Sequence, residues 1–442
     1  MHAASINQPP PHLRWLRALL LLLAIKAAWL SFDAMPRIFL GDSASYLLAA
    51  SSDWMPPDRS FTYPWLLRWL VMPWQSPYGL IVVQSLAGVV SAWLLWWVMR
   101  RRFGVSATIA LLVAGVYACD PAQVFYERMV MAEAIGGLAL MVAFVATVEY
   151  VATARLRWLV ALEFFGLVAV SMRMNLLPVV LVMGAIAPLL AWRGRTDNRR
   201  IGVHMGVALL LLCGLHGGYR HYIAQHFGTR PAWNARSGFM ELGLVLPLVK
   251  PEHLWAEGIS PNVLSLLHYD LHDPAQRGPQ MWSAFGLGDV LGLGDDASGD
   301  ALAGRIARRA VRDDPVGLLR LGIGNARAYF DPRQSTLRLH MDRASVRSYD
   351  AGTAALARKV LNTDIAGTEK VRSPARRWFT VASPWLVFCW FALVPLAAAS
   401  YWKLCKQGRL REGNVLLLYA LGLASTQLLF SSIVSYRYLH PM

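Results

Sequence analysis

The sequence predicts an all-α polytopic membrane protein with about nine or more transmembrane helices and a mixed, mostly α extracytoplasmic domain. Three observations support this prediction. The chain of 442 residues is 56% hydrophobic and only 16% charged, which is more apolar than a soluble protein of this size. Several apolar runs approach the ~20 residues that a helix needs to cross a bilayer. Arginine and lysine gather in alternate connections between those runs.

Nine apolar segments give the order of the predicted helices. Because lysine and arginine mark the cytoplasmic loops of membrane proteins, the alternating basic connections predict a cytoplasmic N-terminus. The segments lie near residues 15–35, 78–99, 103–118, 129–150, 157–170, 176–192, 201–217, 379–402 and 413–432. The outer face then receives residues 36–77, 119–128, 171–175, 218–378 and the C-terminal tail.

One of these outer connections is a short polar break around Arg173. The basic loops on both sides require the chain to leave and re-enter the cytoplasm within residues 157–192. Each limb is short for a full crossing at ~1.5 Å rise per residue. We therefore expect Arg173 to lie slightly below the outer surface, in a shallow cavity.

Long connections divide the chain into three predicted parts. They are an N-terminal transmembrane module, residues 1–217, an extracytoplasmic domain, residues 218–378, and C-terminal transmembrane helices, residues 379–442. The middle part is too long for a loop. Within it, Asp300 is expected to cap a basic amphipathic helix, and residues 315–330 are expected to lie on the membrane surface.

Composition and motifs exclude several classes of function. The net charge of +16 does not indicate a nucleic-acid partner, because basic loops in a membrane protein fix orientation and contact anionic lipid. The sequence contains no P-loop, no GxGxxG after a strand and no HExxH. His268, Asp270, His272 and Asp273 lack the spacing of a metal site, so a surface turn is expected there. No predicted cytoplasmic domain is large enough to hold a nucleotide sugar.

The first outer loop, residues 36–77, begins with a carboxylate at the membrane surface. Asp42 follows the first apolar segment and precedes Tyr46. Asp42 could cap a short helix that starts there. It could equally act as a general base, because a sugar transfer needs a carboxylate to take a proton from the attacking hydroxyl. Both interpretations remain open at this point.

The same loop continues with Asp58, Arg59 and Tyr63. One interpretation is an interfacial turn anchored by aromatic side chains. The other is a phosphate-binding site, since a guanidinium pairs with phosphate in bidentate geometry.

Two further groups of charged residues are predicted at the outer face. Glu127 and Arg128 precede the fourth apolar segment, and Glu133 lies inside it. A carboxylate within the membrane indicates a functional site by default, although a structural pair between Glu133 and Arg173 is an equal alternative. Lys26 is a separate case, because it lies in the middle of the first apolar segment. A charge at that position requires a partner or a cavity, which the sequence does not identify.

Arg437 and Tyr438 follow the last apolar segment. They place a cation and a phenol at the outer face. The alternative is an arginine that reaches toward the lipid headgroups from the end of a helix.

Together these stretches resemble the GT-C superfamily of polytopic membrane glycosyltransferases. The similarity is to bacterial members that use polyprenyl-phosphate sugars, of the mannosyltransferase and aminoarabinose-transferase kind. It covers about residues 30–200 and 380–442 but not 218–378. The matching residues are Gly41-Asp42-Ser43 with Tyr46-Leu47, Arg59-Ser60-Phe61 with Tyr63-Pro64, Glu133, Arg173 and Arg437-Tyr438.

The resemblance implies an inverting glycosyltransferase that moves a sugar from a polyprenyl-phosphate carrier to an acceptor. In it, Asp42 is the base and Glu133 is the second catalytic candidate. Arg59, Arg173 and Arg437 are the candidate ligands of the donor phosphate. The candidate substrate-binding residues are Tyr46, Asp58, Tyr63, Glu127, Arg128 and Tyr438.

The implied partners are a polyprenyl-phosphate-linked sugar donor, membrane lipid, and a glycan, lipid or protein acceptor at the outer face, but no nucleic acid. The implied location is a bacterial inner membrane, with the active site on the periplasmic side. Asp42 has no acidic residue directly beside it, and Asp53 and Asp58 are the nearest substitutes. No cofactor is therefore certain, and a divalent metal ion stays open.

Two other classes of function compete with this interpretation. A transporter or flippase of a lipid-linked sugar should have broken helices and paired repeats, which the sequence does not display. A membrane acyl- or phosphoglycan-transferase would need an outer nucleophile. His216, His221 and His226 are available for that role, but no motif marks them.

The predicted topology is testable with reporter fusions. Reporters after residues 120, 230 and 370 should be active only outside the cytoplasm, and reporters after residues 101, 196 and 408 only inside it, because the basic connections alternate. A cytoplasmic signal from residue 230 would contradict both the topology and the sidedness of the site.

Overall fold

The protein is described here by a computed structural model that covers residues 11–192, 198–342, 349–368, 373–429, 431 and 435–439. Helices form almost all of the regular structure in these ranges. No strand occurs among them, apart from an isolated bridge between Arg37 and Met129. The all-α prediction is thereby confirmed for the described part of the chain.

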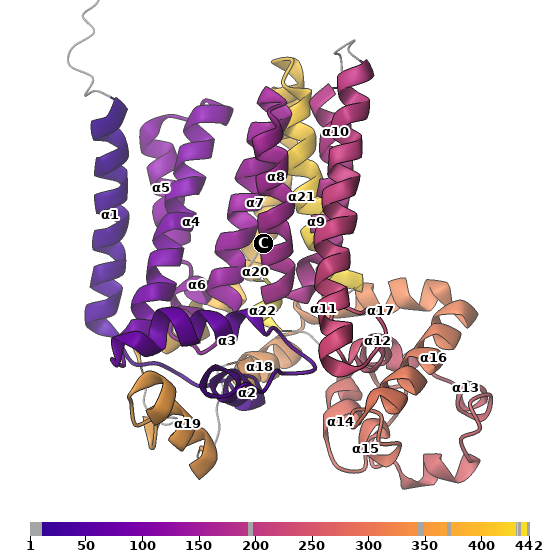
Figure 1. Cartoon of the computed structure of the whole chain (residues 1–442). Helices are drawn as coiled ribbons and strands as arrows, with labels where there is room; N and C mark the ends of the chain where they lie inside the picture. Colours follow the sequence, from indigo (N-terminus) through magenta and orange to yellow (C-terminus); the bar gives the residue numbers. More distant parts are fainter. Residues whose placement is uncertain are drawn as a thin grey trace, which may run out of the picture.

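Long helices stand side by side in one bundle (Figure 1). Each overlaps one of the apolar segments predicted above. They are α1 (Pro11–Phe32), α4 (Gly79–Phe103), α5 (Ala107–Ala118), α7 (Glu133–Thr153), α8 (Leu156–Met172), α9 (Leu177–Trp192), α10 (Asn198–Leu211), α20 (Pro374–Lys406) and α21 (Leu410–Leu429). A π-helical turn (Leu212–His216) joins α10 to α11 (Gly217–Phe227) without a break in direction.

Five helical stretches in the described ranges are long and apolar enough to cross a membrane. The helix α5 is apolar but has only 12 residues. The five stretches are Arg14–Phe32, Gly79–Phe103, Glu133–Thr153, Met174–Trp192 and Arg199–Phe227.

The connections between the long helices separate into two groups at opposite ends of the bundle (Figure 1). The basic connections α4–α5 and α7–α8 lie at one end, together with the N-terminus of α1. The first outer loop, α6 (Pro121–Tyr126) and the short turn η3 (Met174–Leu176) lie at the other end, which is called the site end below. The alternation read from the sequence therefore matches the arrangement of the helices.

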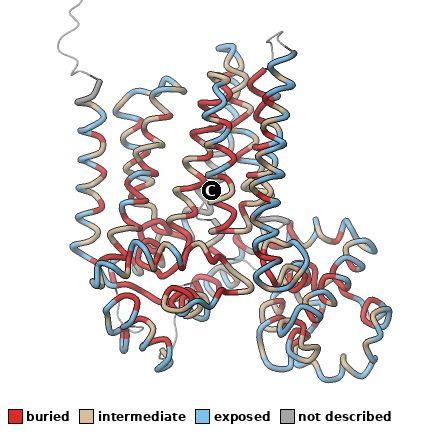
Figure 2. Tube along the Cα trace, viewed as in Figure 1, coloured by how far each residue is buried: buried red, intermediate tan, exposed pale blue. Residues whose placement is uncertain are grey.

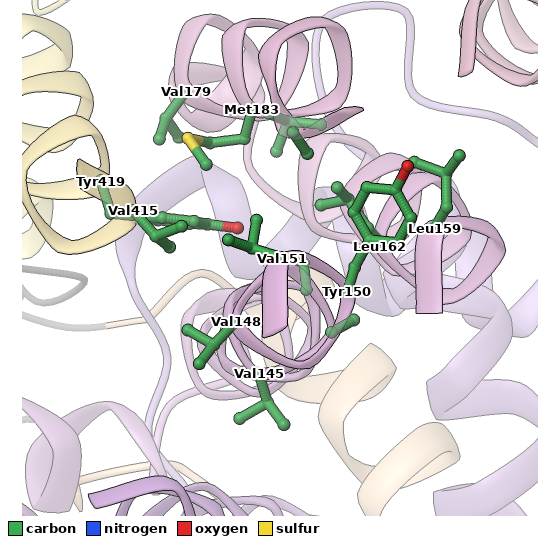
Figure 3. Packing of buried hydrophobic residues seen from close by; sticks show 14 of the residues in the cluster. Val145, Val148, Tyr150, Val151, Leu159, Leu162, Val179, Met183, Val415 and Tyr419 are labelled. Carbon is green, nitrogen blue, oxygen red and sulfur yellow. The ribbon is translucent and has the colours of Figure 1, made fainter. Parts of the chain in front are cut away.

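Tight side-chain packing holds the centre of the bundle together. Figure 2 shows buried residues along the inner faces of the helices, and Figure 3 shows Val151, Leu162 and Val179 among the side chains that meet between α7, α8, α9 and α21. A Cβ on Gly166 would lie 2.7 Å from Val180 Cγ1, so the glycine allows α8 to approach α9 closely. Small residues serve this purpose in membrane helices, where lipid contributes no hydrophobic drive to association.

The described residues of the predicted extracytoplasmic domain, residues 218–378, contribute to more than one buried cluster. Residues from Phe239 to Ala310 form one buried cluster below the bundle (Figure 1). Ala354, Ala357 and Leu361 instead join the core of the first outer loop. The helices of the lower cluster are α12 (Ser237–Val245), α13 (Pro251–Trp255), α14 (Arg277–Trp282), α15 (Leu287–Val290) and α16 (Ala297–Asp313).

The start of α16 differs from the prediction. Asp296, and not Asp300, caps the helix, and its side chain accepts a hydrogen bond from Gly299 N at 2.7 Å. Asp300 lies one turn later and accepts a bond from Phe239 N at 2.8 Å, which joins α16 to α12. Two aspartates four residues apart both suit a cap, and the contact with α12 decides between them.

Three helices between the lower cluster and the C-terminal part lie at the site end of the bundle (Figure 1). The helix α17 (Pro315–Ala328) covers most of the stretch expected on the membrane surface and packs against α21. It is followed by α18 (Pro332–Asp342) and by α19 (Ala351–Leu361), which packs against α2 (Leu40–Ser51).

A buried ion pair supplies the missing partner of Lys26. Its Nζ lies 2.6 Å from Glu127 Oε1, and both side chains are almost completely buried. Gln123 Nε2 donates to the same oxygen at 2.8 Å, and Ser85 Oγ donates to Oε2 at 3.3 Å. The pair therefore connects α1, α4 and the end of α6, and the surrounding donors satisfy the carboxylate.

The Lys26–Glu127 pair should stabilise the fold without taking part in chemistry. Lys26→Met should lower the melting temperature of the purified protein, because it leaves the buried Glu127 carboxylate with only the more distant Arg128, whose Nη1 lies 3.8 Å from Oε2. Breaking a buried pair in this way costs up to roughly 3–5 kcal/mol. Adding Glu127→Gln to that variant should restore most of the loss, since two neutral groups of similar shape are tolerated. Lys403→Met, at an exposed position on α20, is the matched control. Equal melting temperatures for the Lys26 and Lys403 variants would contradict this account.

Candidate active site

The position of Asp42 is fixed by the way in which the first outer loop is joined to the bundle. Arg37 N donates to Arg128 O at 2.7 Å, and Val130 N donates to Arg37 O at 3.0 Å. Ser43 Oγ accepts a bond from Phe39 N at 2.7 Å and donates to Val130 O at 2.9 Å. These bonds hold the first turn of α2 beside the chain that leads into α7.

Asp42 does not cap α2. It lies in the first turn, after the N-cap residue Phe39, and no side-chain capping bond is present there. Its carboxylate is instead held by two arginines. Arg59 Nη1 lies 2.7 Å from Oδ1, and Arg437 Nη1 lies 2.8 Å from Oδ2. One carboxylate therefore joins the first outer loop to the short helix α22 (Tyr436–Leu439) at the C-terminal end.

Arg437 also contacts the second catalytic candidate. Glu133 is the first residue of α7, and its Oε1 lies 2.6 Å from Arg437 Nε. Glu133 is almost fully buried, and its Oε2 has no hydrogen-bond partner among the described residues. The guanidinium also lies over the ring of Phe39, 5.5 Å from its centroid. The side chain of Arg437 is thus held by two carboxylates and an aromatic ring. It does not simply reach toward the lipid headgroups.

Arg59 is held from a second side by its neighbour in the chain. Asp58 accepts bonds from Arg59 Nη2 at 2.7 Å and from Nε at 3.2 Å. Burial lowers the pKa of Arg59, but the carboxylates of Asp42 and Asp58 outweigh burial and raise that pKa above its usual value. Arg59 therefore remains a cation at every physiological pH.

Arg173 lies next to the pair of Asp42 and Arg437 but does not contact Asp42 through a hydrogen bond in the described part of the chain. Its Nη2 donates to the backbone oxygen of Arg437 at 3.0 Å. It follows the last residue of α8, at the turn that the sequence predicts. A Cβ on Gly136 would lie 3.1 Å from Arg173 Cγ, so the glycine gives this side chain room against α7.

The two tyrosines of the loop form the wall behind Asp42. Tyr46 and Tyr63 are buried, with ring centroids 4.9 Å apart in edge-to-face geometry. Burial is the main cause that raises the pKa of Tyr46, and the charge of Asp42 raises it further. Tyr63 Oη donates to Gln84 Oε1 at 3.2 Å. Both phenols therefore stay protonated.

The structure does not support a substrate-binding role for Glu127 and Arg128. Both side chains are completely buried. Glu127 belongs to the pair with Lys26 described above. Arg128 donates to Asp33 O at 2.8 Å and to Val124 O. Both side chains lie inside the bundle, where their partners are other residues of the protein. The side chain of Tyr438, another candidate, lies outside the described residues.

A further carboxylate near the site was not found from the sequence. Asp342, at the end of α18, accepts bonds from Ser435 Oγ at 2.8 Å and from Tyr436 N at 2.7 Å. It lies in a polar helix without a motif, so no pattern in the sequence marks it.

The acidic residues do not gather as metal ligands. Among the described residues, no three His, Cys, Asp or Glu side chains are close enough to hold an ion. Asp42, Asp58 and Glu133 are each paired with an arginine. Asp53 pairs with Arg68 at 3.4 Å and is exposed. Among the described residues, the carboxylates of the site are thus bound to arginines and do not form a set of metal ligands.

The geometry defines a polar site at one end of a membrane bundle, in which a carboxylate and arginines converge. Residues 58–216 match the family model described as dolichyl-phosphate-mannose-protein mannosyltransferase. This match confirms the resemblance to the GT-C superfamily of glycosyltransferases. The matched range contains Arg59, Glu133 and Arg173, whereas Asp42 and Arg437 lie outside it.

No curated protein matches the chain. Two crystal structures of ArnT from Cupriavidus metallidurans are 15% identical to it. The alignment with the apo structure covers 98% of this chain and 78% of the ArnT chain, with a TM-score of 0.36. The alignment with the structure bound to undecaprenyl phosphate covers 96% of this chain and 77% of the ArnT chain, with a TM-score of 0.32.

Proposed function

We propose that this protein is an inverting glycosyltransferase that uses a polyprenyl-phosphate sugar as donor. The acceptor is a glycan, lipid or protein of the cell envelope, on the periplasmic side of a bacterial inner membrane. The observation that supports the proposal most directly is the position of Asp42 between Arg59 and Arg437. A carboxylate can take a proton, and guanidiniums can hold a phosphate, so the site contains both functions that the reaction needs.

The proposed reaction is a single displacement at the anomeric carbon. Asp42 takes the proton of an acceptor hydroxyl while that oxygen forms a bond to the anomeric carbon. The bond from this carbon to the phosphate oxygen breaks, and its electron pair leaves with the phosphate. Attack from the face opposite the leaving group inverts the configuration. Arg59 and Arg437 stabilise the charge that develops on the leaving phosphate.

The resting arrangement implies an order of events. Both oxygens of Asp42 accept charge-assisted bonds from the arginines, so the base is occupied before a substrate arrives. An arriving phosphate carries more acceptor oxygens than a carboxylate and competes for the same guanidiniums. When the phosphate draws an arginine away, an oxygen of Asp42 becomes available to the acceptor hydroxyl. Donor binding before acceptor activation follows from this competition.

The other polar residues support these roles. Glu133 balances the charge of Arg437 and orients its Nε. Arg173 holds the backbone oxygen of Arg437 through a hydrogen bond. The buried rings of Tyr46 and Tyr63 exclude water from the back of the site.

Asp42→Asn tests this proposal. The amide cannot accept the proton, so transfer from a polyprenyl-phosphate sugar should fall by ~10²–10⁴, measured in proteoliposomes. Binding of the sugar-free polyprenyl phosphate should become tighter, because its competitor for Arg59 and Arg437 has lost its charge.

Asp53→Asn is the control, because Asp53 lies in the same loop, is exposed and contacts neither arginine of the site in the described structure. Transfer within a few-fold of wild type for Asp42→Asn would remove Asp42 from the role of base. Weaker binding of the phosphate by this variant would contradict the competition.

A further inference from the structure

We infer that Asp342 is a positioning residue, which holds the turn of residues 435–437 so that Arg437 reaches Asp42 and Glu133. This inference rests on the proposed function for its catalytic meaning. Its structural part stands on contacts of the described residues. Asp342 lies 95 positions before Arg437 in the chain and comes from a different helix, α18.

The bonds of Asp342 act on the residues directly before Arg437. Its Oδ1 accepts from Ser435 Oγ at 2.8 Å, and its Oδ2 accepts from Tyr436 N at 2.7 Å. Ser435 Oγ in turn accepts from Arg437 N at 3.2 Å. The carboxylate and the hydroxyl together therefore order the first backbone donors of α22, and this fixes the direction in which the Arg437 side chain leaves the chain.

The chemistry of a carboxylate suits this position better than that of any neutral side chain. Asp342 is almost fully buried, and burial raises its pKa to about 6, although the bonds from Ser435 and Tyr436 oppose the shift. The group is therefore mostly ionised at neutral pH and has two oxygens that can only accept. An asparagine has one accepting oxygen, so one of the two donors would lose its partner.

Other groups hold the backbone on both sides of these bonds. Tyr329 Oη accepts from Ser435 N at 3.0 Å and donates to Ser435 O at 2.8 Å. Asn325 Nδ2 donates to Ser431 O at 2.9 Å. Arg173 donates to the backbone oxygen of Arg437 from the other direction.

Asn325 lies on α17, Tyr329 directly follows that helix, and Asp342 ends α18. These two helices connect the lower cluster to the bundle. Arg277 of α14 donates to Asn325 Oδ1 at 2.6 Å and extends the same network into the lower cluster. The extramembrane part of the chain thus contributes to the site by placing Arg437. An error of about 1 Å in the position of such a group can cost ~10²-fold in rate, so the contribution is measurable.

The experiment has one readout that does not depend on the activity. Hydrogen exchange of the purified, ligand-free protein in nanodiscs is compared for wild type, Asp342→Ala and Asp296→Ala. Asp296 is the matched control, because it also accepts hydrogen bonds from a hydroxyl and a backbone N–H at the start of a helix. It lies in the lower cluster, away from residues 435–437. Asp342→Ala should speed exchange of the amides of residues 435–437, while Asp296→Ala should leave them unchanged.

The second readout is a double-mutant cycle on sugar transfer, with Asp342→Ala, Arg437→Ala and the double variant. If Asp342 acts through Arg437, its substitution should lower kcat/KM by on the order of 10-fold or more in the wild-type background. It should have little further effect when Arg437 is already alanine, because the two effects are then not additive. Asp342→Glu should recover part of the activity, since it keeps the carboxylate.

The outcomes separate the two proposals. Unchanged exchange at residues 435–437, or a full additive loss in the Arg437→Ala background, would overturn the positioning role. Faster exchange in Asp342→Ala would support the positioning role even if the wild-type protein transferred no sugar from any lipid-linked donor. That second result would contradict the proposed function alone.

Discussion

The site depends on one interaction, the sharing of the Asp42 carboxylate by two guanidiniums from opposite ends of the chain. Arg59 lies in the same loop as Asp42, whereas Arg437 follows all of the long helices in the sequence. A charge near the membrane surface is expensive to leave unpaired, so the pairing restrains both ends of the chain. The contacts of Ser43 with the chain before α7 and of Asp342 with the C-terminal turn can be understood as supports for this one carboxylate.

Hydropathy and charge gave the position of each residue along the bundle axis but not its direction around the bundle. The basic connections and apolar runs predicted Asp42, Arg59, Arg173 and Arg437 at the same end, and the contacts among these residues agree with that prediction. Glu127 and Arg128 lie at that end as well, yet they face Lys26 and the backbone of α6. A 20-residue apolar helix has no strong amphipathic face, because lipid and protein interior are both apolar. Rotation about the axis, which decides between catalysis and packing, is therefore not encoded in the pattern.

The extramembrane part was harder to predict for a different reason. A polar segment of this length could form an independent domain or a set of helices packed against the bundle. Both arrangements form all of their backbone hydrogen bonds and bury apolar faces of modest size, so the sequence does not distinguish them. The lower cluster folds around its own core, whereas Ala354 and Ala357 complete the core of the first outer loop. The role of Asp342 was not visible from the sequence, since a single carboxylate in a polar helix is ordinary until its partners are known.

The two charged groups at the site end differ in a way that separates structure from function. The side chains of Lys26 and Glu127 are 3% and 0% exposed, and neutral donors around them satisfy the carboxylate. Those of Arg59, Arg437 and Asp42 are 19%, 23% and 25% exposed. A fully enclosed pair has no route by which a ligand could replace either partner, and exchange would expose a buried charge. In the partly open group, a phosphate can replace the carboxylate on the guanidiniums while the released carboxylate remains close to solvent. The difference in exposure is therefore the physical reason for which we propose Asp42 for the chemistry and Glu127 for the stability of the bundle.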